Sequence, residues 1–229
     1  MNQLILSFSL TLLFILPCKN TFAQDDYIDD AALWISFNLE KKINKHVFLH
    51  LSQQNRITEN MSTYGRGNVD FGITYRITKN IRLMGDYVYL KRPNPDNSFT
   101  NEHRGYIALI LKKNIGRWDF SYRNMVQMRF KDIYSSYEGK VPKYYERNKL
   151  TVKYDLNKYI NPYLSGELFY PFYQGKSKGF NKSRTAIGMN YNLNKHTQLD
   201  VYFLYQYELN AFNPTNRDYV YGLGFSHEL

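Results

Sequence analysis

The C-terminal stretch constrains the fold of this chain more than any other feature. From Tyr219 to Leu229 every odd position is large, aromatic or amphipathic, and the even positions are small or polar apart from Val220. This period of two is typical of a β-strand that has one apolar and one hydrated face. The stripe continues to the last residue of the sequence. We therefore expect the chain to finish on a half-apolar strand.

The same alternation recurs along the rest of the sequence. Eleven strand-like stretches alternate with turns, at residues 33–40, 46–57, 68–77, 81–91, 104–112, 117–130, 147–154, 160–170, 183–191, 198–209 and 218–229. Most are about 9–12 residues long, which suits an apolar band of roughly 25 Å crossed at a tilt. Backbone groups cannot stay unpaired in lipid, so such a sheet has to close on itself.

Short and long connections alternate between these stretches. The short ones lie near 41–45, 78–80, 113–116, 155–159 and 192–196, and the long ones near 58–67, 92–103, 131–146, 171–182 and 210–217. Outer-membrane barrels have short periplasmic turns and longer external loops. We therefore predict an antiparallel transmembrane β-barrel. A soluble lipocalin-like barrel or a periplasmic sandwich is the alternative, because alternation alone does not separate them.

The number of strands raises a difficulty. Eleven strands would place the start of the first strand outside the cell if the C-terminus is periplasmic, and bacterial single-chain barrels have even numbers. We predict about 12 strands, with the acidic segment 24–32 adding a short one. Ten is possible if the first strand is irregular or folds inward.

The N-terminus has the pattern of a secretory signal. Residues 4–16 form a nearly unbroken apolar run, too short for a spanning helix of about 20 residues. A small-x-small site ends at Ala23, so we expect a cleaved signal peptide over 1–23 and a barrel domain over 24–229. Cleavage would remove the only cysteine, Cys18, and leave no disulfide. Lipidation at this cysteine is the other possibility, although the proline before it fits poorly.

Composition narrows the class of partner. The mean hydropathy is negative, but barrels escape that test because only alternate residues face lipid. The chain has 22 tyrosines, which concentrate where apolar and aqueous regions meet. The formal net charge is +10. An exported basic protein rarely meets nucleic acid, so we expect a location in the bacterial outer membrane, with its lipid and lipopolysaccharide as partners. Small anionic solutes are a further candidate partner.

The stripe opposite the apolar one should face the lumen, and it is rich in cations. The candidate lumen-lining and solute-binding residues are Arg56, Arg76, Arg82, Arg117, Arg123, Arg129, Arg147, Lys149 and Arg184. Acidic residues such as Glu167 share this stripe, so one interpretation is a structural barrel sealed by ion pairs. The other is a narrow pore, because rings of Arg and Lys select anions.

A catalytic interpretation is weaker. Outer-membrane phospholipases and lipid A deacylases use Ser with His. His50 and Ser52 share one face of a strand, whereas the neighbours Ser226 and His227 point to opposite faces. A lipid hydrolase that uses His50 and Ser52 is therefore the alternative function. The five histidines show no metal-ligand spacing and there is no phosphate-binding loop, so we expect no metal and no cofactor.

Two resemblances complete the sequence evidence. The last strand resembles the C-terminal targeting strand of outer-membrane barrels, which implies the barrel-assembly machinery as a partner. The mature chain resembles a family of exported bacterial proteins known as a domain of unknown function, number twenty-four ninety. The motifs are 33–35 with 39–43, 51–56, 70–77 and the final strand. This resemblance implies an outer-membrane β-barrel of unassigned activity and supplies no catalytic residues.

Overall fold

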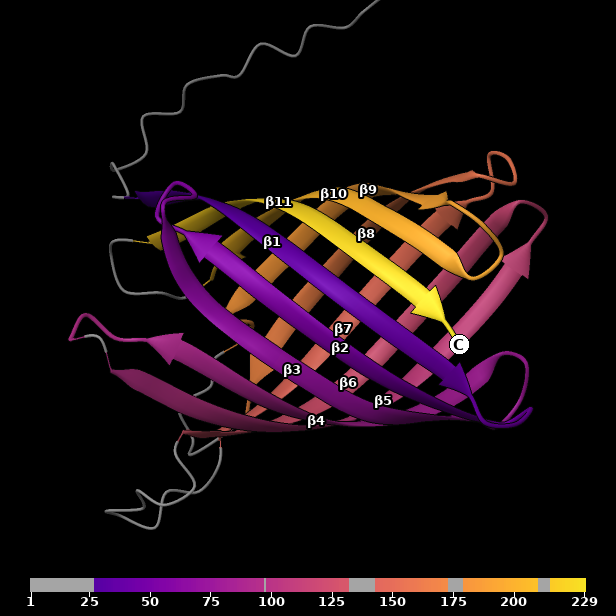
Figure 1. Ribbon diagram of the computed structural model, residues 1–229, viewed down its shortest axis with the longest axis horizontal. Coiled ribbons are helices and arrows are strands. Elements are labelled where there is room, and N and C mark those ends of the chain that lie inside the picture. Colours follow the sequence, from indigo (N-terminus) through magenta and orange to yellow (C-terminus); the bar gives the residue numbers. More distant parts are fainter. Residues whose placement is uncertain (1–26, 97, 132–142, 173–178, 210–214) are drawn as a thin grey trace, which may run out of the picture.

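The chain forms a single closed β-barrel. The computed structural model describes residues 27–96, 98–131, 143–172, 179–209 and 215–229. In this part the strands are β1 (Tyr27–Lys42), β2 (Val47–Thr58), β3 (Thr63–Arg76), β4 (Ile81–Pro93), β5 (Phe99–Ile115), β6 (Trp118–Lys131), β7 (Lys143–Tyr154), β8 (Ile160–Pro171), β9 (Lys182–Asn192), β10 (Thr197–Glu208) and β11 (Thr215–Glu228). Each strand pairs with its neighbour in sequence, and β1 closes the ring against β11. Figure 1 shows the strands running obliquely across the barrel wall.

The described residues contain no helix that is long and apolar enough to cross a membrane.

The closing pair is parallel because the number of strands is odd. All other neighbours are antiparallel, but β1 and β11 are parallel, in register from Tyr27 opposite Thr215 to Glu40 opposite Glu228. The prediction of about 12 strands is close to the eleven found. The step from eleven to 12 was wrong, because it assumed an antiparallel closure. Residues 27–32 form no separate strand but are the first part of β1.

Exposed apolar side chains cover most of the outer wall of the barrel. Phe71, Ile107, Leu164 and Ile187 are 55%, 58%, 55% and 63% exposed, and they belong to four different strands. Soluble proteins bury side chains of this kind, so the exposure marks a surface made for hydrocarbon. The outward stripe predicted from the sequence is therefore a surface suited to lipid.

Aromatic side chains gather at both rims of this wall. At one rim the rings of Trp118 and Tyr154 lie 4.7 Å apart between centroids. At the other rim the ring of Tyr205 lies 5.5 Å from that of Tyr219. Such girdles mark the two membrane–water interfaces of transmembrane barrels.

Successive connections lie alternately at the two ends of the barrel. One end, here called the turn end, carries the connections 43–46, 77–80, 116–117, 155–159 and 193–196 and the C-terminus (Figure 1). The opposite end, the loop end, has connections that include 59–62 and 94–98. These two are shorter than predicted because β3 and β5 begin several residues earlier. The expected signal peptide, 1–23, lies outside the described residues.

Apolar side chains inside the barrel cluster on two opposite walls. One cluster comes from β1, β9, β10 and β11, and contains Ala32, Trp34, Ala186, Leu204 and Val220. The other comes from β4, β5 and β6, and contains Val88, Tyr106, Ala108 and Met125. Tyr202 packs against the first cluster, and its ring lies where a side chain on Gly222 would collide with it. These clusters narrow the lumen, and the charged side chains lie between them.

Candidate functional site

The lumen holds a cavity of about 800 Å³ that extends from the loop end to the middle of the barrel. Ten cationic side chains line it: Arg56, Arg66, Arg92, Arg104, Arg123, Arg129, Arg147, Lys149, Lys182 and Arg184. Five carboxylates line it: Asp70, Asp86, Glu167, Asp200 and Glu208. The cavity wall therefore carries an excess of positive charge.

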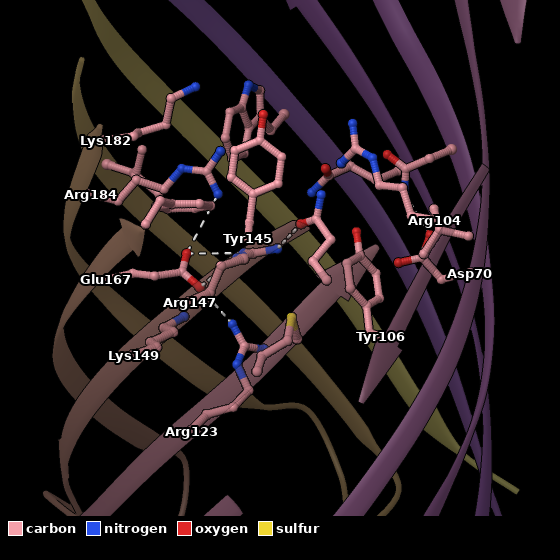
Figure 2. Close-up of a pocket in the computed structure, with 18 of the residues that line it drawn as sticks. Asp70, Arg104, Tyr106, Arg123, Tyr145, Arg147, Lys149, Glu167, Lys182 and Arg184 are labelled. Atoms are coloured by element: carbon pink, nitrogen blue, oxygen red, sulfur yellow. Dashed lines mark hydrogen bonds and ion pairs between the residues drawn. The ribbon is translucent and has the colours of Figure 1, made fainter. Parts of the chain in front are cut away.

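A single carboxylate, Glu167 on β8, holds three guanidinium groups. Its side chain is buried, with 6% of its surface exposed. Arg123 and Arg147 each donate a hydrogen bond of 2.9 Å to its Oε1 atom, and Arg184 lies 3.6 Å from Oε2. Figure 2 shows these three side chains converging on Glu167 from different strands. One negative charge thus orients three positive ones and leaves this side of the cavity positive.

A second ion-pair group comes from β5 and β6. Glu102 on β5 is 2% exposed and contacts two guanidinium groups, at 2.5 Å from Arg104 and 2.6 Å from Arg129. Figure 2 places Arg104 beside Asp70, across the cavity from Glu167. Here too the cations outnumber the carboxylate that holds them.

Two further arginines face each other without a carboxylate. Arg56 on β2 and Arg66 on β3 are direct partners in the register and both line the cavity. Like charges in this position repel. Within the described residues neither makes an ion pair, and the Nε atom of Arg66 is buried without a hydrogen-bond partner. This pair is therefore a local source of positive charge that no carboxylate compensates.

Aromatic rings hold some of these arginines in place. The guanidinium carbon of Arg56 lies 3.4 Å from the ring centre of Trp34, and that of Arg184 lies 5.3 Å from the same ring. Arg184 and Arg147 also lie 4.8 Å and 4.6 Å from the ring of Phe169. Rings can attract a cation through their faces without neutralising its charge. The arginines are thereby positioned while their positive charge stays available to a solute.

The chemistry that this arrangement can perform is anion recognition. A guanidinium group presents a planar set of N–H donors that matches the oxygens of carboxylates and phosphates. Several such groups around one cavity could surround a small oxyanion from more than one side. Within the described residues no group of three His, Cys, Asp or Glu side chains is placed to hold a metal ion.

The structure brings together six of the nine residues named from the sequence. Those that line the cavity are Arg56, Arg123, Arg129, Arg147, Lys149 and Arg184. Arg76 and Arg82 lie nearer the turn end, 4.4 Å and 5.9 Å from the ring of Phe48. Arg117 does not lie in the lumen but is exposed in the turn 116–117, because β6 begins only at the next residue.

Four cations that line the cavity were missed at the sequence level. They are Arg66, Arg92, Arg104 and Lys182. Arg66, Arg92 and Lys182 were assigned to loops because no apolar residues alternate with them there. Arg104 begins a predicted strand but was not assigned a face. Extending each strand by its period would have placed all four on the inward stripe.

The two candidate catalytic residues lie on the lumen side of β2 but engage different partners. His50 Nε2 lies 3.0 Å from Asp86 Oδ1. The Ser52 hydroxyl donates a hydrogen bond of 2.6 Å to Asn38 Oδ1. A side chain on Gly72 would collide with the His50 ring and with Asp86, so glycine there makes room for this pair. Both residues face away from the hydrocarbon, where the acyl chains of a lipid substrate would lie.

The fold and its lumen define a class of protein: a closed transmembrane-type β-barrel with an apolar outer wall and a charged interior. The family can also be stated. The chain belongs to the family described as a protein of unknown function (DUF2490), whose model matches residues 31–217. No curated protein matches the chain.

Solved structures of similar shape come from autotransporters. One is the translocator domain of autotransporter NalP from Neisseria meningitidis, with 10% identity, a TM-score of 0.45, and 72% of this chain and 70% of that chain covered. Another is the beta domain of the Bordetella autotransporter Brka, with 11% identity, a TM-score of 0.46, and 78% and 82% covered.

Proposed function

We propose that this protein is an outer-membrane barrel that forms a narrow pore for small anionic solutes. The observation that carries the proposal is the excess of cationic over acidic side chains on the wall of the cavity. The cavity lies between two apolar clusters inside the closed sheet. In such a confined space, charges of one sign attract counter-ions strongly and repel ions of the same sign.

The unpaired arginines favour a solute-binding lumen over a barrel sealed by ion pairs. A sealed interior requires that buried charges be paired. Arg56 and Arg66 violate this rule at neighbouring positions, and an anion between them would relieve their repulsion. Toward the turn end the inward stripe continues with Arg76, Arg82 and Lys112, so the positive lining extends beyond the cavity.

The proposed location rests on the outer wall and on both ends of the sequence. The exposed apolar band and the two aromatic girdles suit a bilayer. The signal-like segment 1–23 and the final strand fit export and recognition by the barrel-assembly machinery. The outer leaflet lipopolysaccharide would surround the loop end. In cells, Phe225→Asp on the outward stripe of the last strand is expected to reduce the amount of heat-modifiable barrel in outer-membrane fractions, whereas an unchanged amount would contradict this location.

Ion selectivity tests the proposed function. The mature chain in a planar bilayer is expected to give a reversal potential of the sign for chloride permeation under a KCl gradient. The double variant R56Q/R66Q is expected to shift this potential toward zero, because it removes two uncompensated charges. Arg117→Gln, on the exposed turn, is the matched control and should leave it unchanged. Cation-selective current, or no current from correctly folded barrel, would overturn the proposal.

A further inference from the structure

A group of polar side chains lies on the outer wall of the barrel, where lipid is expected. Asn124 on β6 faces outward, as do Glu146 and Asn148 on β7. Asn124 Nδ2 donates hydrogen bonds of 2.7 Å to Glu146 and 2.9 Å to Asn148. Asn148 Nδ2 donates one of 3.2 Å to Glu146, and the Tyr122 hydroxyl donates one of 2.6 Å to Asn148. We call these four residues the outer polar cluster.

The depth of this cluster is what makes it unusual. Asn124 lies midway between Trp118 and Phe130 on the outward stripe of β6. With a rise of about 3.3 Å per residue and a tilt of about 40°, it lies roughly 15 Å from each of them along the barrel axis. That is close to the middle of the hydrocarbon. Its outward neighbours Leu109 and Val126 are apolar and exposed.

Polar groups at this depth do not stabilise a single barrel in lipid. A leucine in place of Asn124 or Asn148 would cost nothing to expose to hydrocarbon, whereas the amide of an asparagine is costly to expose there. The cluster satisfies part of its own hydrogen-bonding capacity, but each asparagine and the carboxylate keep further donors or acceptors. In bilayers such groups hold protein surfaces together, because a partner can pair with them where lipid cannot.

We infer that β6 and β7 form the contact between two copies of this chain in the membrane. The cluster offers both amide donors and carboxylate or carbonyl acceptors, so it is complementary to itself. A two-fold contact requires a patch of this kind, because the same surface meets itself. Lipid head groups are a poorer occupant, since they do not reach the depth of Asn124 and Asn148 and their phosphates would be repelled by Glu146.

The position of the patch in the ring is compatible with such a pair. β6 and β7 lie on the wall away from the β1–β11 junction (Figure 1). The junction and the lumen stay untouched when two barrels meet there. Glu146 is the register partner of Tyr170 and lies nearer the loop end than Asn124 and Asn148, so the two copies of Glu146 would meet above the level of the asparagines. The inference requires a barrel in a bilayer but not a conducting one.

Single cysteines on opposite walls test the inference. Apart from Cys18 in the expected signal peptide, the chain has no cysteine. Leu150→Cys lies beside the cluster, and Tyr221→Cys on β11 is the control, since the two side chains are 52% and 51% exposed. In phospholipid vesicles at low protein density, a short thiol-reactive cross-linker is expected to join two copies through position 150 and not through position 221. Equal cross-linking at both positions, or none at position 150, would overturn the inference.

Replacing the cluster provides the second arm of the experiment. In the Leu150→Cys background, N124L/N148L is expected to lower the cross-linked fraction about tenfold, which corresponds to losing about 1.4 kcal/mol of contact. The same variant should be at least as resistant to heat in gel-mobility assays as the parent, because leucine suits lipid better. A folded variant that cross-links as before would contradict a role for the cluster. Because none of these readouts measures current, they stand apart from the test of the pore.

Discussion

Glu167→Gln is the most informative single change in the lumen. The substitution keeps the shape of the side chain but removes the negative charge that Arg123, Arg147 and Arg184 share. Breaking a buried ion pair by removing one partner costs about 3–5 kcal/mol, because the remaining charge is left uncompensated. The cavity admits water to these arginines and the amide keeps one acceptor oxygen, so we expect the lower end, about 3 kcal/mol.

Denaturant unfolding from lipid vesicles measures this loss. The chain has two tryptophans, and Trp34 reports on the lumen through its contact with Arg56. The exposed carboxylate Glu40 supplies the control, since Glu40→Gln should change the unfolding free energy by less than about 0.5 kcal/mol. The double variant E167Q/R184Q should recover part of the loss, because it removes one of the stranded cations. A loss below about 0.5 kcal/mol for Glu167→Gln would refute the reasoning.

Two other features give independent predictions. Gly222→Ala should destabilise the barrel by about 1–3 kcal/mol, because the added methyl group would collide with the Tyr202 ring. Gly166→Ala is the control and should be close to neutral in the same unfolding assay, because a methyl group there has no atom within 4 Å. The parallel closure predicts that cysteines introduced at Ile35 and Leu223, which are partners in the register, can be joined by a short cross-linker. The joined chain contains a covalent loop and should therefore run at a different position on denaturing gels. A chain that cannot be joined at these positions would mean that the barrel closes differently.

The strand pattern was predictable because lipid imposes it. Outward residues such as Ile107 and Ile187 must be apolar, so their period of two is visible in the sequence. The strands continue beyond the apolar band, where neither face is constrained to be apolar. This is why β5 was predicted to begin at Arg104 rather than at Phe99, and why the first turn of the loop end was predicted to be too long.

The closure of the ring could not be read from the pattern. Alternation fixes the face of each residue but not the direction of the strand that pairs with β1. The parallel pairing follows from the odd number of strands, in which the first and last run the same way. Eleven strand-like stretches can be counted in the sequence, and the prediction moved from eleven to 12 only because an even number of strands was assumed.

The lumen was predictable as a charged surface but not as a set of ion pairs. Parity alone places Arg123, Arg147 and Arg184 on the inward face. That all three meet Glu167 depends on the register of four strands, which the sequence does not state. For the same reason the uncompensated pair, Arg56 with Arg66, could not be distinguished from paired arginines.

Spin labels placed one at a time along β10 test the central claim most directly. In vesicles, labels at Val201 and Phe203 should be accessible to oxygen dissolved in the lipid, and labels at Tyr202 and Leu204 should be protected from it. The account predicts this alternation at each step along the strand. Equal oxygen accessibility at neighbouring positions, or an alternation with the opposite phase, would contradict a barrel whose apolar stripe meets hydrocarbon and whose charged stripe lines the lumen.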